Sequence, residues 1–345
     1  MACAFLSPCV CAGNYGGVQL SGSIARDALA LAEQPYLDVC YRSQPGPRLD
    51  HVGCTDSRIA AAVQAIRIRS QVNKVLVWHV DMLKLLPLVK PRGSGAFLFL
   101  HGIEAWRKLD GIWAALLRLV DVFLTNSQFT WSRFIDCNPE WHGSTHRVVP
   151  LGLGITEPSQ VQPDDRPAAI VVGRMDRREG YKGHKELLRA WPDVLRCHPR
   201  AELWLVGGGD LEMELRRAVV STGLKESVKF YGRVKDEVKL QLIRRARCLL
   251  LPSRGEGFGL VYLEAMRQGR PCLVSTVDAG QEVVNPPEAG LSVDPEDLDA
   301  VSASVSRLLT AGPEWELWSA RARALYESTY TAAHFEQRLL AALDH

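Results

Sequence analysis

Short apolar runs alternate with longer amphipathic segments along the whole chain. The runs have the length of buried strands, and the segments between them repeat apolar residues with the period of a helix. Such alternation predicts parallel sheets that are covered by helices on both faces. Strands are expected at 3–7, 37–41, 75–79, 96–100, 122–126, 147–149, 168–172, 201–206, 228–231, 248–251 and 272–275, and helices at 21–32, 58–70, 112–120, 128–135, 185–197, 211–222, 235–245, 260–268, 298–310 and within 315–343.

The strand–helix pattern begins anew after residues 150–167, a segment rich in Pro, Gly, Asp and Gln that has little periodicity. Such a composition is typical of a linker, and a chain of 345 residues fits two domains. We therefore predict an α/β protein with two Rossmann-like, doubly wound domains, at 1–153 and 154–325. Folds of this kind bind ligands in a crevice, here expected as a cleft between the two domains.

Charge and cysteine content narrow the function classes. The net charge of +2 is too small to indicate a nucleic-acid-binding protein. Residues 1–153 carry a net charge of +4 and residues 154–345 a net charge of −2, which permits peripheral membrane contact through the N-terminal half, where residues 80–89 form an apolar stretch. The nine cysteines are interpreted as reduced thiols. Without a visible signal peptide or membrane-spanning run, the expected location is cytoplasmic, with peripheral contact at the inner face of the membrane left open.

The strongest chemical signal is a glycine-rich loop between an expected strand and an expected helix. Residues 252–266 read PSRGEGFGLVYLEAM. The glycines let the backbone approach a ligand closely, and the N–H groups at a helix start favour a phosphate. Glu256 lies in this loop and Glu264 about two turns into the helix. Alone, such a pair is more often a solvated loop and helix surface, but the glycine context favours a functional site.

This stretch resembles the signature of the retaining GT-B glycosyltransferases of family 4, P-S-x-x-E-G-F-G-L-x-x-L-E-A-M-x-x-G-x-P, which continues here through Pro271. The resemblance covers nearly the whole chain and is strongest over 168–285. It implies that Glu264 binds the ribose hydroxyls of a nucleotide and that Glu256 lies near the sugar and acts in catalysis. It implies that residues 326–345 form a helix that packs back on the N-terminal domain. Donor contacts are also implied for Gly257, Phe258, Gly259 and Leu260.

Two basic residues open the C-terminal domain. Arg174 ends an expected strand and Lys182 precedes the next helix, so both could neutralise a diphosphate without a metal. Loop cations are more often merely solvated, but this pair resembles the family's G-R-x…K-G element, which grips the donor phosphates. The insert at 176–180 makes Lys182 a better match than Arg177 or Arg178.

Weaker signals follow two other strands of this domain. Gly208 lies in a V-G-G-G-D turn that is either structural or in backbone contact with the nucleotide. The turn lacks the G-x-G-x-x-G fingerprint of dinucleotide-binding proteins. Arg233 and Val234 stand in a segment that resembles the family's F-x-G-x-V element, which flanks the base.

The N-terminal half contributes a glycine pair and a histidine. Gly16 and Gly17 are either a simple turn or, as in related enzymes, part of a loop that closes over the donor diphosphate. His101 ends a strand in a motif that resembles the family's H-G-x element near the donor sugar. A lone histidine is often structural, but its place at a strand end favours a catalytic role. Ser127 is interpreted as a helix cap.

These signals together predict a retaining glycosyltransferase that moves a sugar from a nucleoside-diphosphate sugar to an acceptor hydroxyl in polysaccharide or glycoconjugate synthesis. The acceptor is expected to be a saccharide, a lipid-linked molecule or a small molecule. No cofactor or metal is expected, because Arg174 and Lys182 could neutralise the donor diphosphate. The alternatives are a sugar-nucleotide epimerase of the same fold and a catalytically silent partner subunit that binds a nucleotide sugar.

Overall fold

The chain folds into two compact units in the computed structural model, which describes residues 2–8, 16–31, 36–41, 54–55, 57–154 and 162–344. Unit 1 comprises Met1–Leu153 and Ala332–His345, and unit 2 comprises Gly154–Thr331. The family resemblance predicts that the returning C-terminal segment begins at residue 326. The structure starts it at Ala332, because a helix of unit 2 continues to Thr329.

Unit 1 is built on a seven-stranded sheet whose described pairings are all parallel. Most of its strands are short apolar runs buried on both faces, as helices above and below a parallel sheet require. The strands are β1 (Ala2–Pro8), β2 (Tyr36–Tyr41), β3 (Cys54–Thr55), β4 (Val72–Val77), β5 (Gly95–Leu100), β6 (Val122–Thr125) and β7 (His146–Val148). Their spatial order is β3-β2-β1-β4-β5-β6-β7.

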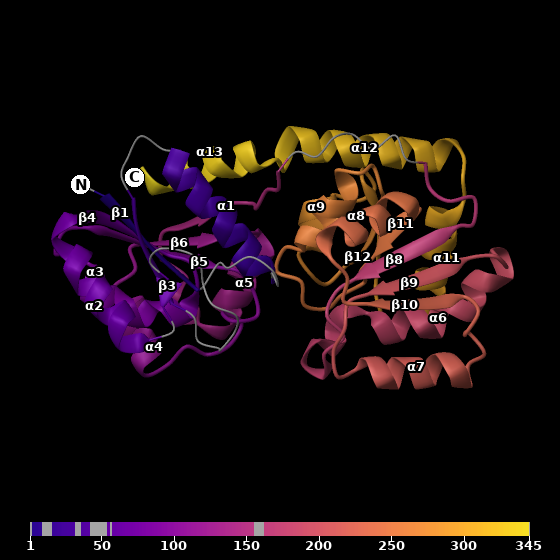
Figure 1. Ribbon diagram of the computed structural model, residues 1–345, viewed down its shortest axis with the longest axis horizontal. Helices are drawn as coiled ribbons and strands as arrows, with labels where there is room; N and C mark the ends of the chain where they lie inside the picture. The colour runs from indigo at the N-terminus through magenta and orange to yellow at the C-terminus, as the bar shows by residue number, and fades with distance from the viewer. Residues whose placement is uncertain are drawn as a thin grey trace. The chain divides into compact units, whose positions relative to one another are not determined.

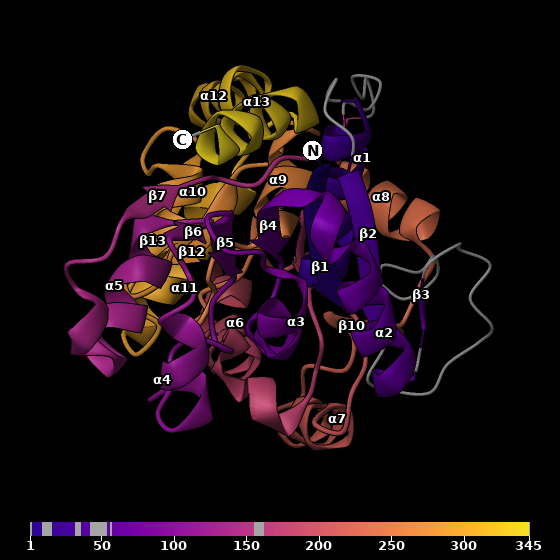
Figure 2. The ribbon, with the colours of Figure 1, turned by 90° about the vertical axis from the view of Figure 1, so that its left-hand side faces the viewer.

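Helices cover both faces of this sheet. One core cluster joins the sheet to four helices, and the other face is covered by the first and last helices of the unit (Figures 1 and 2). The four helices are α2 (Arg58–Ile68), α3 (Leu86–Val89), α4 (Ile112–Leu117) and α5 (Gln128–Cys137), and the other two are α1 (Gly17–Leu31) and α13 (Ala332–Leu343). Shorter turns of 3₁₀ helix are η1 (Arg69–Gln71), η2 (Val80–Leu85) and η3 (Pro139–Trp141).

Unit 2 repeats the architecture with six parallel strands. They are β8 (Ala168–Val172), β9 (Glu202–Val206), β10 (Val228–Gly232), β11 (Cys248–Leu250), β12 (Cys272–Ser275) and β13 (Gly290–Val293), in the order β10-β9-β8-β11-β12-β13. The helices are α6 (His184–Cys197), α7 (Glu212–Ser221), α8 (Asp236–Arg245), α9 (Leu260–Met266), α10 (Gly280–Val284), α11 (Leu298–Leu309) and α12 (Pro313–Thr329), with η4 (Arg177–Lys182) as a 3₁₀ turn. Helices α6, α7 and α11 share one core cluster with the sheet (Figure 1).

Both sheets are wound outward in two directions from their first strand. The reversal falls between β1 and β4 in unit 1 and between β8 and β11 in unit 2. Loops that leave the carboxyl ends of the strands at such a reversal form the ligand site of doubly wound folds. The two doubly wound domains predicted from the sequence are therefore confirmed, and these loops are the expected place of a ligand site.

Three expectations require correction. The apolar stretch at 80–89 is no membrane-facing surface, because Val80, Leu83, Leu86 and Val89 are completely buried in the core of unit 1. The interpretation of the cysteines as reduced thiols is wrong at Cys40, which is disulfide-bonded. The apolar pattern also fails to predict β3 and β13, which are too short and too polar to be recognised as apolar runs.

Candidate functional site

The loops after β8 and β11 lie side by side at the carboxyl edge of the sheet in unit 2. The Arg254 amide donates a hydrogen bond to the Tyr181 carbonyl over 2.9 Å. Gly183 has a left-handed φ of 79°, and a Cβ atom placed there would lie 2.6 Å from the Pro252 carbonyl oxygen. This close approach requires glycine, and it brings the Lys182 side chain to the glycine-rich loop.

Lys182 and Glu256 form the first ion pair of the site. Lys182 Nζ lies 2.7 Å from Glu256 Oε1, and each side chain is only 14% exposed. Burial lowers the pKa of Lys182, but the Glu256 carboxylate and, more weakly, Glu179 at 3.5 Å outweigh it, so that the pKa is raised above its ordinary value. Arg174 pairs with Glu179 and remains largely exposed. Two cations, Arg174 and Lys182, therefore share Glu179 as a partner in the segment that follows β8.

Glu264 and Lys239 form a second ion pair. Glu264 lies on α9, and its Oε1 is 2.9 Å from Lys239 Nζ on α8. Only 9% of the Glu264 side chain is exposed. Burial lowers the pKa of Lys239, while Glu264 and the nearby Asp236 raise it, with a net rise. Lys239 is not among the site residues predicted from the sequence, where the one signal for it is that its helix follows the F-Y-G-R-V segment.

The remaining residues of the signature loop have mainly structural contacts. Gly259 has a φ of 82°, and a Cβ atom there would lie 2.4 Å from the Tyr262 ring. The Phe258 ring is buried and packs edge-on against Tyr330 at 6.0 Å between ring centres. The Phe258 ring thus belongs to the interior of unit 2, whereas Gly257 and Leu260 are partly exposed.

The glycine turn after β9 supports the loop after β8. The Met175 amide donates a hydrogen bond to the Gly208 carbonyl over 3.1 Å, and a Cβ atom on Gly209 would lie 2.4 Å from Met175. Arg233 is exposed, and its side chain lies over Gly208, while Val234 is half-buried. Among the described residues, no hydrogen bond or ion pair joins Arg233 to either signature glutamate.

The predicted residues of the N-terminal half belong to unit 1. Gly16 precedes α1, whose first residue is Gly17, and the Gly16 carbonyl accepts hydrogen bonds from Gln19 and Leu20. Residues 13–15 of the same predicted loop lie outside the described ranges. Ser127 caps α5 by accepting a hydrogen bond from the Thr130 amide, as predicted.

His101 is buried at the carboxyl end of β5. Its Nε2 lies 2.6 Å from the Trp78 carbonyl oxygen, and because a carbonyl can only accept, this nitrogen carries the proton. The ring stacks on Phe99 at 4.7 Å between ring centres. Burial lowers the pKa of His101 to about 4, so the imidazole is neutral at neutral pH. His101 is therefore a neutral hydrogen-bond donor in this structure, and its ring is fixed by Trp78 and Phe99.

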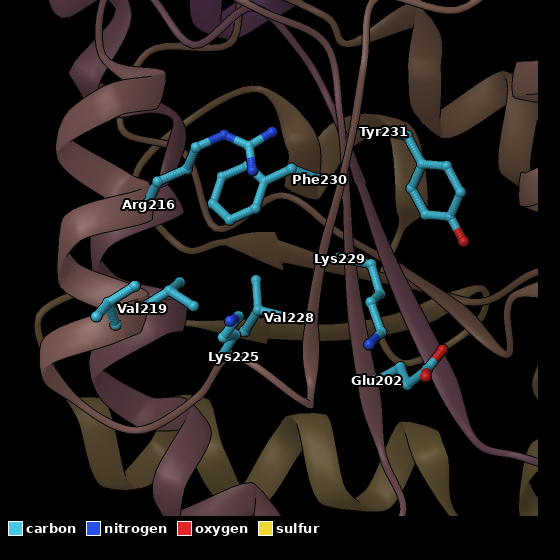
Figure 3. Close-up of a pocket in the computed structure, with 9 residues that line it drawn as sticks. Glu202, Arg216, Val219, Lys225, Val228, Lys229, Phe230 and Tyr231 are labelled. Atoms are coloured by element: carbon cyan, nitrogen blue, oxygen red, sulfur yellow. The ribbon is translucent and has the colours of Figure 1, made fainter.

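A separate cavity of about 720 Å³ lies along the edge strand β10. Arg216 stacks on the Phe230 ring, 4.3 Å from the ring centre, on one side of the strand, and Lys229 and Tyr231 project on the other (Figure 3). None of the predicted site residues lines this cavity. In the described part of the chain, no three His, Cys, Asp or Glu side chains gather as a metal site would require.

Comparisons with known proteins agree with the fold and the signature loop. Residues 166–311 match the family model described as glycosyl transferases group 1. The chain is 30% identical, over 69% of its length, to a GDP-mannose-dependent monoacylated alpha-(1-6)-phosphatidylinositol monomannoside mannosyltransferase of Corynebacterium glutamicum, of which it covers 67%. The chain belongs to the group 1 glycosyltransferases.

This glycosyltransferase also matches another curated relative over a shorter part, and two solved structures over nearly the whole chain. It is 35% identical to the O-antigen chain mannosyltransferase B of Escherichia coli, over 45% of this chain and 40% of that protein. Its structure resembles a sucrose-phosphate synthase from Thermosynechococcus elongatus with a TM-score of 0.77 at 20% identity, covering 99% of this chain and 98% of the other. The Anabaena protein Alr3699/HepE, in complex with UDP-glucose, gives a TM-score of 0.77 at 18% identity, with 99% of both chains covered. These likenesses confirm the GT-B fold.

Proposed function

We propose that this glycosyltransferase transfers a sugar, with retention of anomeric configuration, from a nucleoside-diphosphate sugar held by unit 2. The observation that carries the proposal is the pair of lysine–glutamate contacts at the strand reversal of unit 2, Lys182 with Glu256 and Lys239 with Glu264. Two carboxylates next to two cations suit a ligand that carries both hydroxyl groups and phosphates.

The leaving diphosphate gains negative charge as the bond to the sugar breaks. Arg174 and Lys182 would stabilise this charge, together with the backbone amides at the start of α9, which lack partners within the helix. Glu264 would accept hydrogen bonds from the ribose, and Glu256 would act next to the sugar. In this scheme the leaving phosphate removes the acceptor proton on the same face of the sugar, which accounts for retention.

GDP-mannose is the first donor to test. Two relatives at 30% identity are named as GDP-mannose-dependent mannosyltransferases that act on phosphatidylinositol mannosides. We accordingly propose mannosyl transfer to a lipid-linked or saccharide acceptor. Release of GDP from GDP-mannose, compared with release from UDP- and ADP-sugars, tests the donor. An epimerase would instead interconvert the donor sugar without an acceptor, and a silent partner subunit would bind the donor without turnover.

A nucleoside diphosphate should bind this enzyme without a metal, because Arg174 and Lys182 supply positive charge for the phosphates. At about 100 times its dissociation constant it should raise the free energy of unfolding by roughly 2.7 kcal/mol. Thermal unfolding with GDP, UDP or ADP in EDTA measures the effect. If none of the three raises the melting temperature, the assignment of the donor site is wrong.

We further propose that unit 1 touches membranes through α2 rather than through residues 80–89. Ile59, Val63 and Ile66 share one face of α2 and are 78%, 39% and 56% exposed. The helix leads to Arg69, which lines a cavity together with Arg118 and other basic residues. Within the described residues, no helix has the length and apolar content needed to cross a membrane.

The double substitution Ile59→Ser and Ile66→Ser should therefore reduce sedimentation with vesicles that contain anionic phospholipid, and added salt should reduce it further. Met213 and Val220 on α7 have the same spacing and similar exposure, so replacing both with Ser is the matched control. Equal sedimentation of the two double variants would refute the assignment of α2.

A further inference from the structure

A buried carboxyl group lies directly beneath the signature loop. Asp278 is in the short segment between β12 and α10 and is only 3% exposed. Carboxyl groups are costly to bury without a partner, yet no described lysine, arginine or histidine pairs with this one. Lys182 pairs with Glu256 instead. The charged or titratable groups that face Asp278 are Glu256 from the loop after β11 and Tyr262 from α9.

Backbone hydrogen bonds account for the position of Asp278. Its Oδ1 accepts from the Gly280 amide over 2.8 Å, and its Oδ2 accepts from the Glu256 amide over 3.3 Å. The Ala279 amide in turn donates to the Glu256 carbonyl over 3.1 Å. Both backbone groups of Glu256 are thus held by the segment after β12. The Ser253 hydroxyl, which accepts from the Gly255 amide, also bonds to Asp278.

We propose that Asp278 is a positioning residue that fixes the backbone of Glu256, and so presents the Glu256 carboxylate to Lys182 and to the donor sugar. This inference rests on the proposed function of Glu256. Asp278 itself does not touch the substrate. It acts through the loop, in which a displacement of the Glu256 carboxylate by about 1 Å is enough to cost on the order of 10²-fold in rate.

The charge state of Asp278 fits this role. Burial and, more weakly, the Glu256 carboxylate raise the pKa of Asp278, the hydrogen bonds from Gly280, Glu256 and Ser253 partly oppose the rise, and the net pKa is about 8. The group therefore carries a proton at neutral pH, where it accepts both amide hydrogen bonds without a second negative charge beside Glu256. Above about pH 8 the ionised carboxylate repels Glu256, and kcat should fall as this ionisation proceeds.

Two variants separate the effect of the Asp278 hydrogen bonds from the effect of its ionisation. Asp278→Asn has one acceptor oxygen, so it loses one of the two amide bonds and cannot ionise. It should lower kcat by about 10-fold with little change in the donor KM, and the alkaline fall of kcat should disappear. Asp278→Ala loses both bonds and should lower kcat by on the order of 10²-fold. Amide hydrogen exchange should become faster at Glu256 in Asp278→Ala, and at Glu256 or Gly280 in Asp278→Asn.

Asp294 provides the matched control. It follows the neighbouring strand β13, and its Oδ1 accepts from the amide two residues ahead, that of Glu296, over 2.9 Å, but it has no bond to the Glu256 loop. Asp294→Asn should leave kcat, the pH profile and Glu256 exchange unchanged.

The results test the positioning role of Asp278 separately from the proposed function. Unchanged Glu256 exchange in Asp278→Ala, or wild-type kcat in that variant, would overturn it, as would an alkaline limb that persists in Asp278→Asn. If Asp278→Ala does not fold, Asp278→Asn decides on the same three measurements. If the wild-type enzyme turns over no nucleoside-diphosphate sugar, the proposed function fails. The exchange measurement still tests whether Asp278 holds the Glu256 backbone.

Discussion

Replacing Lys182 with Met should lower kcat by on the order of 10²- to 10³-fold, the scale of a lost contact to charge that develops in the transition state. Lys182 Nζ lies 2.7 Å from Glu256 and only 14% of the side chain is exposed, so this cation is held in place before the donor arrives. A charged side chain that is already in position needs no reorganisation when the diphosphate leaves. Release of nucleoside diphosphate at saturating donor and acceptor measures kcat.

Lys185→Met is the control for this variant. Lys185 lies in the first turn of α6, three residues after Lys182, is half-exposed and pairs with Glu214, outside the loops of the site. It should keep wild-type kcat. Because Lys182→Met leaves the Glu256 carboxylate without its main cation, unfolding of both variants must also be measured. A Lys182→Met enzyme that folds and keeps wild-type kcat would contradict the proposed role of Lys182.

Much of the fold could be predicted because the strands of a parallel sheet are apolar on both faces. The runs at β8 and β12 coincide with the predicted strands, and the other long strands differ from prediction by a few residues at their ends. The two-residue strand β3 and the strand β13, which reads GLSV, carry too little apolar sequence to be distinguished from loops.

Residues 80–89 show a second limit of prediction from sequence. An apolar stretch that contains Pro87 has no helical or strand period, so its sequence cannot show whether it faces the core or the surface. The structure folds it as η2 and α3, with Val80 and Val89 buried in unit 1. Three exposed aliphatic side chains of the unit lie instead on α2, where Gln64 and Arg67 interrupt the apolar sequence.

The candidate site could be located from its loops but not from its contacts. Glycine patterns after β8 and β11 mark the two loops, and strand order places them side by side. The contacts of Lys182 with Glu256 and of Lys239 with Glu264 join side chains 74 and 25 residues apart. Such pairs depend on how loops and helices pack over the sheet edge, which no local pattern encodes. Lys239 and Asp278 were missed for this reason.

The two signature glutamates should respond differently to loss of charge, because they face different parts of the donor. Glu256→Gln should lower kcat by on the order of 10²-fold or more, since this carboxylate would act beside the sugar as the bond to phosphate breaks. Glu264→Gln should mainly raise the donor KM, because ribose contacts change little between ground state and transition state.

The two substitutions are well matched structurally. Each removes one carboxylate from a lysine pair, and each leaves that lysine a second acidic partner, Glu179 at 3.5 Å for Lys182 and Asp236 at 3.0 Å for Lys239. Neither lysine is therefore left unpaired, and a change in kinetics reports on the glutamate itself. Donor titrations at saturating acceptor, with circular dichroism to check the α9 helix, separate kcat from KM. If both variants keep wild-type kcat and KM, the pair has no part in catalysis or donor binding, and unit 2 must hold the donor through other residues.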